Sequence, residues 1–94
     1  MASETVPQKV KESKKKPKIT RPWQVILYND DIHSFEEVIR QVQKATGYSL
    51  LEATRITLEA HFGGKALVYE GSFTRCNQIA GVLREIGLII EILG

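Results

Sequence analysis

The chain has 94 residues, which suffice for one small domain, and the single cysteine, Cys76, excludes an internal disulfide. Its 13 basic and 11 acidic side chains leave a net charge of only +2. No apolar run approaches the roughly 20 residues of a membrane span, and neither a secretory signal nor a Cys/His zinc pattern is present, so we expect a cytoplasmic protein without a metal or other cofactor.

The charges are distributed unevenly along the chain. Residues 1–21 hold seven basic and two acidic side chains, whereas residues 22–94 hold six basic and nine acidic ones. The first segment is too poor in apolar residues to form a core, so we expect a flexible basic extension over 1–21 and one folded domain over 22–94. A lysine-rich tail is compatible with nucleic-acid binding, which predicts steep salt dependence. Nothing in the folded part favours that hypothesis, and we expect neither nucleic acid nor membrane as a partner.

The first half of the domain predicts a strand and a helix. β-Forming residues occupy 23–28 after Pro22, a residue tolerated where a strand begins. Ser34 to Glu37 is a capping box, and helical spacing then continues over residues 35–46 until Gly47, which suits a left-handed cap.

The second half predicts four more elements. In chain order they are a helix over residues 50–61, a strand over 66–70, a helix over 76–86 and a strand over 88–92. A second capping pattern, Ser49 to Glu52, begins the first of these helices, and Gly63-Gly64 ends it. The order β-α-α-β-α-β predicts an α+β sandwich in which a three-stranded antiparallel sheet carries its helices on one face.

Polar side chains cluster where the first strand ends. Asn29, Asp30 and Asp31 follow that strand, and His61 ends a helix that we expect to pack nearby. Asp30 supplies charge, while Asn29 and neutral His61 supply further acceptors, which together match the donors of an ammonium group. We do not expect this polar cluster to carry out covalent catalysis, because no nucleophilic side chain accompanies the histidine.

Apolar residues accompany this polar cluster. Ile32, Phe35 and Val38 come directly after the acidic turn and are placed to wall a cavity beside it. An ammonium group beside an apolar cavity describes the N-terminus of a peptide whose first side chain is large and hydrophobic. Three simpler interpretations stay open: a turn that only caps the next helix, a histidine satisfied by a helix end, and a divalent metal site with few ligands.

Three motifs resemble the ClpS adaptor family. They are Trp-x-Val-Ile-Leu-x-Asn-Asp-Asp at residues 23–31, His-x-x-Gly-Lys-Ala at 61–66 and Gly-Leu-x-x-Glu-Ile at 87–92. The resemblance covers residues 22–94. It implies a monomeric, non-enzymatic N-degron adaptor that binds proteins beginning with Phe, Tyr, Trp or Leu. Such an adaptor delivers them to a Clp AAA+ unfoldase through that partner's N-terminal domain, with residues 1–21 taking part.

The resemblance also implies roles for particular residues. Those matching Asn29, Asp30 and His61 bind the α-amino group and the first peptide unit, and the one matching Phe35 gates the hydrophobic pocket. The remaining pocket positions that the family implies are Ile32, Val38, Thr57 and Leu88.

Two departures from the family pattern leave the preferred first residue and the unfoldase open. The gate is commonly methionine, and the helix that here begins near Thr74-Arg75-Cys76-Asn77 usually carries acidic residues. An alternative hypothesis is a protein recruitment module, similar in fold to the C-terminal domain of the ribosomal stalk protein, that does not recognise N-termini.

Overall fold

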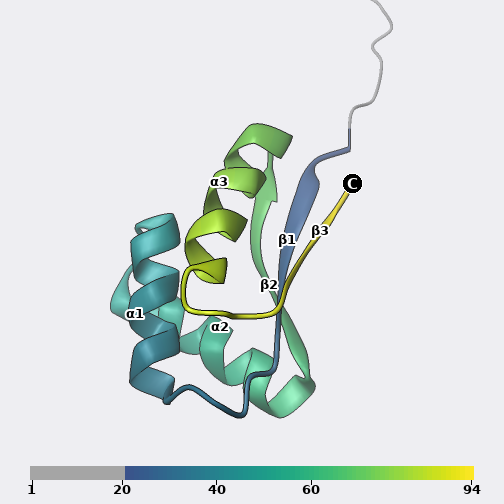
Figure 1. Cartoon of the computed structure of the whole chain (residues 1–94). Coiled ribbons are helices and arrows are strands. Elements are labelled where there is room, and N and C mark those ends of the chain that lie inside the picture. Colours follow the sequence, from purple (N-terminus) through teal and green to yellow (C-terminus); the bar gives the residue numbers. More distant parts are fainter. Residues whose placement is uncertain (1–20) are drawn as a thin grey trace, which may run out of the picture.

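The computed structural model describes residues 21–94 and contains three strands and three helices in the predicted order. They are β1 (Trp23–Tyr28), α1 (Phe35–Thr46), α2 (Leu50–Gly63), β2 (Lys65–Gly71), α3 (Phe73–Arg84) and β3 (Ile90–Leu93) (Figure 1). The predicted α+β sandwich is confirmed. The predicted flexible extension lies, except for Arg21, outside the described residues. Among these residues, no helix combines the length and the apolar character that crossing a bilayer requires.

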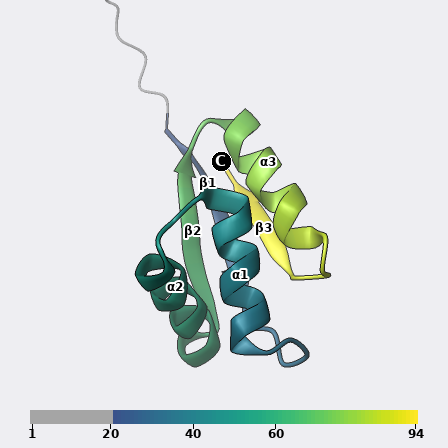
Figure 2. The same cartoon turned by 90° about the vertical axis from the view of Figure 1, so that its left-hand side faces the viewer.

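The sheet has the strand order β2-β1-β3, and both pairings are antiparallel. Figures 1 and 2 show the helices on one face of this sheet, as the sequence predicted. The register with β2 shifts between Val25 and Ile26, because Val25 pairs with Tyr69 while Ile26 pairs with Leu67. Val68 is therefore the extra residue of a β-bulge, and the shift turns both Val68 and Tyr69 towards the helices. Nothing in the sequence predicted this bulge.

The core lies between the sheet and the helices. Val25 and Leu27 of the central strand are buried, and they pack with Ile56 of α2 and with Ile79 and Leu83 of α3. Helices α2 and α3 contact the sheet directly, whereas α1 packs on both of them (Figure 2). The start of α1 is thereby held beside the end of α2, where the predicted site residues lie.

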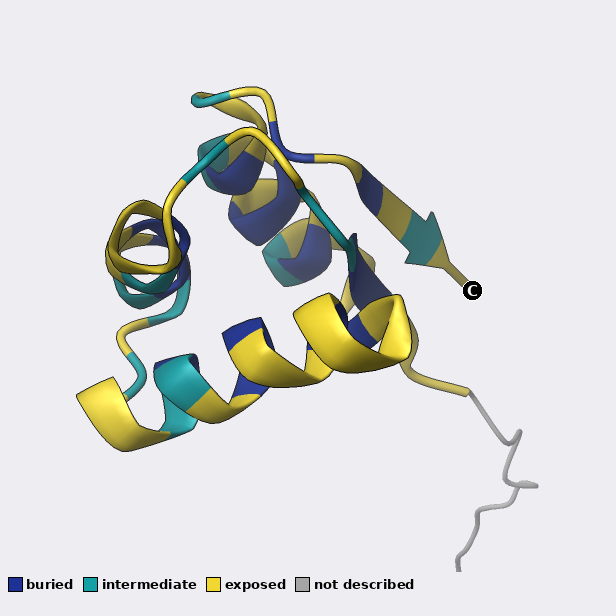
Figure 3. Cartoon of the chain, turned by 90° about the horizontal axis from the view of Figure 1, so that it is seen from below, coloured by how far each residue is buried: buried dark blue, intermediate teal, exposed yellow. Residues whose placement is uncertain are grey.

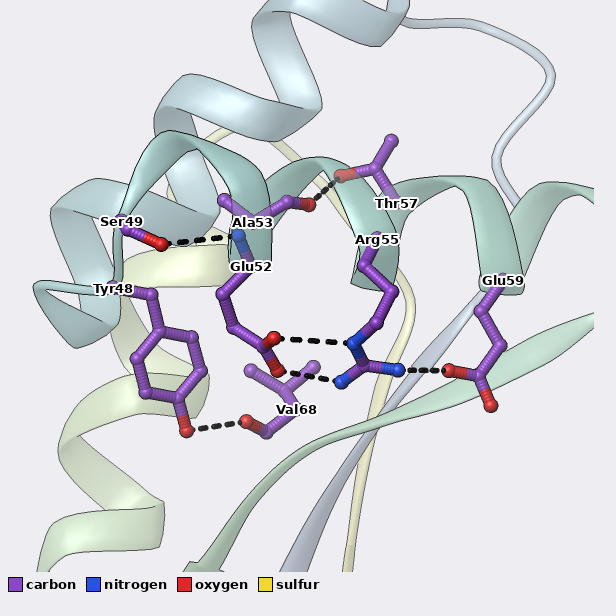
Figure 4. Close-up of polar contacts among 8 residues, drawn as sticks. All are labelled: Tyr48, Ser49, Glu52, Ala53, Arg55, Thr57, Glu59 and Val68. Carbon is purple, nitrogen blue, oxygen red and sulfur yellow. Dashed lines mark hydrogen bonds and ion pairs between the residues drawn. The ribbon is translucent and has the colours of Figure 1, made fainter.

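The helix boundaries follow from capping. Ser34 and Glu37 form the predicted capping box of α1, and Gly47 ends the helix with a left-handed φ of 81°. At α2 only half of the predicted capping pattern forms: the Ser49 side chain accepts from the backbone amide of Glu52. The Glu52 carboxylate instead binds Arg55 (Figure 4), because an ion pair one turn along competes with the cap.

The last two elements differ from prediction by a few residues. Helix α3 begins at Phe73 rather than Cys76, because the Ser72 side chain caps it through the backbone amide of Arg75. The helix ends at Arg84, and the predicted stop, Gly87, adopts a φ of 87° in the turn that follows. Strand β3 starts at Ile90, where the antiparallel register with β1 begins opposite Leu27, although the backbone amide of Tyr28 already donates to the carbonyl of Ile89 over 3.0 Å.

Candidate functional site

A cavity is lined by residues from the end of β1, the start of α1 and the end of α2. Figure 1 shows these three ends at the lower end of the molecule. Its empty volume is ≈ 280 Å³, including space that is open to solvent. The residues that line it are Leu27, Tyr28, Asn29, Asp30, His33, Phe35, Val38, Thr57, Ala60 and His61. Two segments about thirty residues apart in the sequence therefore build one site.

Backbone pairing brings these two segments together. The amide of Asn29, directly after β1, donates to the carbonyl of Gly64, directly after α2, over 2.9 Å. Gly64 adopts a φ of 93°, a left-handed conformation that costs glycine little and ends α2 at this point. The polar residues after the strand are thus fixed next to His61.

Asp30 organises the loop between β1 and α1. Its Oδ1 accepts from the backbone amides of Ile32 at 2.6 Å and His33 at 3.3 Å, and its Oδ2 contacts the Nδ1 of His33. Burial raises the pKa of Asp30, but the bonds from the Ile32 amide, the His33 ring and the His33 amide together leave that pKa below its ordinary value. Asp30 therefore stays ionised at the edge of the cavity.

The same contact favours the protonated form of His33. The hydrogen bond to Asp30 raises the pKa of His33, burial opposes this, and the carboxylates of Asp30 and Glu37 and the carbonyl of Ile86 raise it further. The loop after β1 is thus attached to its own aspartate through His33. The sequence analysis missed His33, although its position three residues after Asp30 is a common spacing for such a contact.

Asn29, Asp31 and His61 form the solvent-facing part of the polar cluster. The Asn29 Nδ2 donates to the Asp31 Oδ1 over 3.1 Å, which leaves the Asn29 carbonyl oxygen free to accept. Asp31 and His61 are exposed, and Asn29 is half-buried. An incoming cation would therefore meet an amide oxygen, an imidazole and two neighbouring carboxylates.

The apolar part of the cavity comes from three elements. Phe35 packs edge-on against the His61 ring, with ring centroids 4.9 Å apart. Val38 of α1 and Leu27 of β1 are buried, and Thr57 of α2 uses its hydroxyl to donate to the Ala53 carbonyl over 2.8 Å (Figure 4). Thr57 consequently offers the cavity mainly its methyl group.

The structure brings six of the eight predicted site residues to this cavity and leaves two away from it. The six are Asn29, Asp30, Phe35, Val38, Thr57 and His61. Ile32 does not line the cavity, because its backbone turns in to bind Asp30 while its side chain is 88% exposed. Leu88 is not in the cavity either: it is only 4% exposed and packs in the main core before β3.

Besides His33, the sequence analysis missed three lining residues. Leu27 and Tyr28 were predicted only as strand residues, without a role in the site. The small side chain of Ala60 carries no chemical signal of a binding residue. Ala60 lies one helical turn after Thr57, so helical spacing from a predicted lining residue would have indicated it.

The arrangement can bind a ligand that is cationic at one end and apolar at the other. The carboxylate of Asp30 and the free acceptors are at one side, and the buried side chains of Leu27 and Val38 are at the other. Within residues 21–94, no group of three or more His, Cys, Asp or Glu side chains is arranged to hold a metal ion.

The fold and this cavity define a small α+β domain with a candidate binding site at the end of its sheet. The sequence profile of the family described as "ATP-dependent Clp protease adaptor protein ClpS" matches residues 18–86. The chain belongs to the ClpS family of Clp protease adaptors, and the family predicted from the sequence motifs is confirmed.

Individual relatives agree with this assignment. The ATP-dependent Clp protease adapter protein ClpS of Nocardia farcinica is 32% identical over 71 residues, which cover 76% of this chain and 67% of the relative. The protein of the same name from Escherichia coli is 39% identical over 67 residues, or 71% of this chain and 58% of the relative. The chain thus spans about three fifths to two thirds of the length of these relatives.

A solved structure shares the fold. Agrobacterium tumefaciens ClpS2 bound to L-phenylalaninamide matches with a TM-score of 0.71 over 77% of this chain and 94% of that one. The two sequences are 22% identical in this comparison. At that identity the likeness establishes the α+β architecture, and the predicted fold is confirmed on this ground also.

Proposed function

We propose that the protein is a non-enzymatic, cytoplasmic N-degron adaptor. It binds proteins whose first residue is Phe, Tyr, Trp or Leu and delivers them to a Clp AAA+ unfoldase and its peptidase. One observation carries the proposal: a polar cluster that suits an ammonium group adjoins a cavity lined by buried Leu27 and Val38. Only the first residue of a polypeptide combines a free α-amino group with a side chain at the same carbon atom.

The α-amino group would be held by Asn29, His61 and the two carboxylates. The free Asn29 carbonyl oxygen and the His61 ring accept hydrogen bonds, while Asp30 and Asp31 supply the negative charge. The two carboxylates divide this role. Asp30 fixes the conformation of the loop through hydrogen bonds within it and attracts the ammonium group electrostatically. Exposed Asp31 has a carboxylate oxygen within hydrogen-bond distance of Asn29.

The first side chain would enter the space between Phe35, Val38 and Thr57. Burying an aromatic or leucine side chain there contributes about 1.5–3 kcal/mol. The ligand of the Agrobacterium relative, L-phenylalaninamide, has a free α-amino group and an aromatic side chain, so it supports this mode of binding. Phe35 would act as the gate, because it stands at the mouth against His61.

Delivery would use a different surface and the basic extension. The unfoldase's N-terminal domain is the proposed partner, and the start of α3 is the proposed contact. The first turn of α3 has no acidic residue; Thr74 and Asn77 are exposed there, and Cys76 is buried. The proposed adaptor acts as a monomer and needs no cofactor.

Calorimetric titration tests the binding step. A peptide beginning with Phe should bind, and its N-acetylated twin should bind at least about tenfold more weakly, because acetylation removes the charge and leaves acceptors unpaired. The same peptide beginning with Ser is the control for the cavity. Equal affinity for the free and acetylated peptides would refute the proposal.

A degradation assay tests the delivery step. A Phe-initiated reporter should be degraded faster by a purified Clp unfoldase and peptidase when this protein is added. A reporter that begins with Ser should show no such acceleration. Pull-down of the reporter without accelerated degradation would limit the function to binding and favour the recruitment-module alternative.

A further inference from the structure

Three aromatic rings form a continuous row across the mouth of the cavity. Phe35 and His61 have ring centroids 4.9 Å apart at 86°, and His61 and Phe62 have centroids 4.8 Å apart at 84°. The first ring belongs to α1 and the other two to the end of α2. The row therefore begins inside the proposed binding site and ends outside it.

Phe62 contacts the His61 ring but contributes nothing to the hydrophobic core. Its side chain is 79% exposed. The outward side of α2 on which it lies is largely solvent-exposed (Figure 3). Replacing a side chain that exposed changes stability little, so its chemistry is available for binding.

We infer that Phe62 binds the second residue of the substrate and gives the protein a preference for large apolar side chains at that position. This inference rests on the proposed function. If the first α-amino group lies beside Asn29 and His61, the second Cα lies about 3.8 Å from the first one. The Phe62 ring lies next to His61, with ring centroids 4.8 Å apart, so a second side chain that passes His61 would meet it.

The expected preference is moderate. Covering part of a leucine side chain with the Phe62 ring should tighten binding by about fivefold relative to serine at the same position. An aromatic second residue should gain similarly, since the exposed ring is free to pack edge-to-face with it.

Leu51 provides a matched control on the same helix. It precedes Phe62 by eleven residues, which is three helical turns, so both side chains lie on the same face roughly 16 Å apart. Leu51 is 81% exposed, much like Phe62. If Phe62 served instead as one end of an apolar stripe for a protein partner, Leu51→Ala and Phe62→Ala would have the same effects.

The experiment uses four peptides and four proteins. Peptides beginning Phe-Leu and Phe-Ser, otherwise identical, and their N-acetylated forms are titrated into the wild-type chain and into Phe62→Ala, Leu51→Ala and Ile32→Ala. Ile32 is included because it is exposed on the loop side of the cavity, where a peptide leaving in the other direction would pass.

We expect the wild-type protein and Leu51→Ala to bind the Phe-Leu peptide about fivefold more tightly than the Phe-Ser peptide. Phe62→Ala should bind the two peptides equally. The inference is overturned if the wild-type protein discriminates less than twofold, if Phe62→Ala keeps the preference, or if only Ile32→Ala loses it. In those cases the weaker binding of the acetylated peptides still supports the proposed function. Equal binding of free and acetylated peptides refutes both.

Discussion

The imidazole of His33 contacts the carboxylate of Asp30 through Nδ1 and Oδ2 at the edge of the cavity. When His33 is protonated, a cation of the protein itself lies against the carboxylate that was predicted to receive the cation of a ligand. Both side chains are mostly shielded from solvent, with 18% of His33 and 9% of Asp30 exposed. The contact therefore couples the stability of the loop to the protonation of His33 and Asp30 and to the binding of an amine.

The first prediction concerns stability against pH. The pKa of Asp30 is lowered from 3.8, so its contribution is present above that pH and is lost as the pH falls through the folded-state value. The pKa of His33 is raised from 6.5, so its contribution is complete below that pH and is lost as the pH rises through its folded-state value. The pair should stabilise the fold most between these limits and less in alkaline solution.

Urea unfolding of the wild-type protein and of His33→Gln should show this window. The difference between their midpoints should be larger at pH 5.5 than at pH 8.5, with Asp30→Asn and the double variant completing a mutant cycle. A difference that is constant over this range would mean that His33 does not change its charge, and the ion-pair interpretation would then fail.

The second prediction concerns binding against pH. While His33 is protonated, it neutralises part of the charge of Asp30, and a substrate amine gains less from that carboxylate. Affinity for a Phe-initiated peptide should therefore rise between pH 5.5 and pH 6.5, below the range of about pH 7.7–8.0 in which a free α-amino group loses its proton. In His33→Gln the rise should be smaller. Parallel pH profiles in the two proteins would contradict this coupling.

The third prediction separates the two neighbouring carboxylates. Within residues 21–94 the Asp31 side chain makes one hydrogen bond, from Asn29, and it is exposed, so Asp31→Asn should weaken peptide binding while leaving unfolding unchanged. Asp30→Asn should weaken binding and also destabilise the chain, because the oxygens of Asp30 bind two backbone amides and His33. Calorimetry and urea unfolding of both variants measure the two effects. Loss of stability in Asp31→Asn would show that this division of roles is incorrect.

Local signals explain why part of this site could be predicted. Strand β1 and helix α1 are delimited by Pro22, the Ser34 to Glu37 capping box and Gly47, all of which act within a few residues in the sequence. The convergence of Asn29 with His61 could also be predicted, since the order of elements places the end of the strand near the end of the second helix.

Contacts between distant residues explain what could not be predicted. Leu88 follows a helix and precedes a strand, and only the packing of the whole core shows that it is buried away from the cavity. The outward direction of the Ile32 side chain depends on the hydrogen bond between its backbone amide and Asp30, which the spacing of apolar residues does not reveal. The bulge at Val68 depends on the pairing of β2 with β1 across more than forty residues.

The fourth prediction tests whether Thr57 is a wall or a ligand contact. Its hydroxyl already donates to the carbonyl of Ala53, so a substrate should meet its methyl group. Thr57→Val keeps the shape of the side chain and should leave the affinity for a Phe-initiated peptide within twofold. Loss of the internal hydrogen bond should reduce the free energy of unfolding by about 1 kcal/mol. A tenfold loss of affinity would instead assign the hydroxyl to the bound peptide.

The fifth prediction concerns the bulge that shapes β2. The Tyr48 hydroxyl, just before α2, donates to the carbonyl of Val68, the extra residue of the bulge, over 2.7 Å (Figure 4). Tyr48→Phe removes this bond and leaves the Val68 carbonyl without it, which should lower the free energy of unfolding by about 1 kcal/mol. Urea unfolding measures this effect.

Tyr69→Phe is the matched control for that variant. Tyr69 is also half-buried, but within residues 21–94 its hydroxyl makes no side-chain hydrogen bond, so its removal should cost less. Peptide binding should be unchanged in both variants, because Val68 lies three residues along β2 from Lys65, roughly 10 Å from the strand end beside the cavity. Equal destabilisation by the two substitutions would show that the Tyr48 bond does not hold the bulge, and that packing of the two rings does.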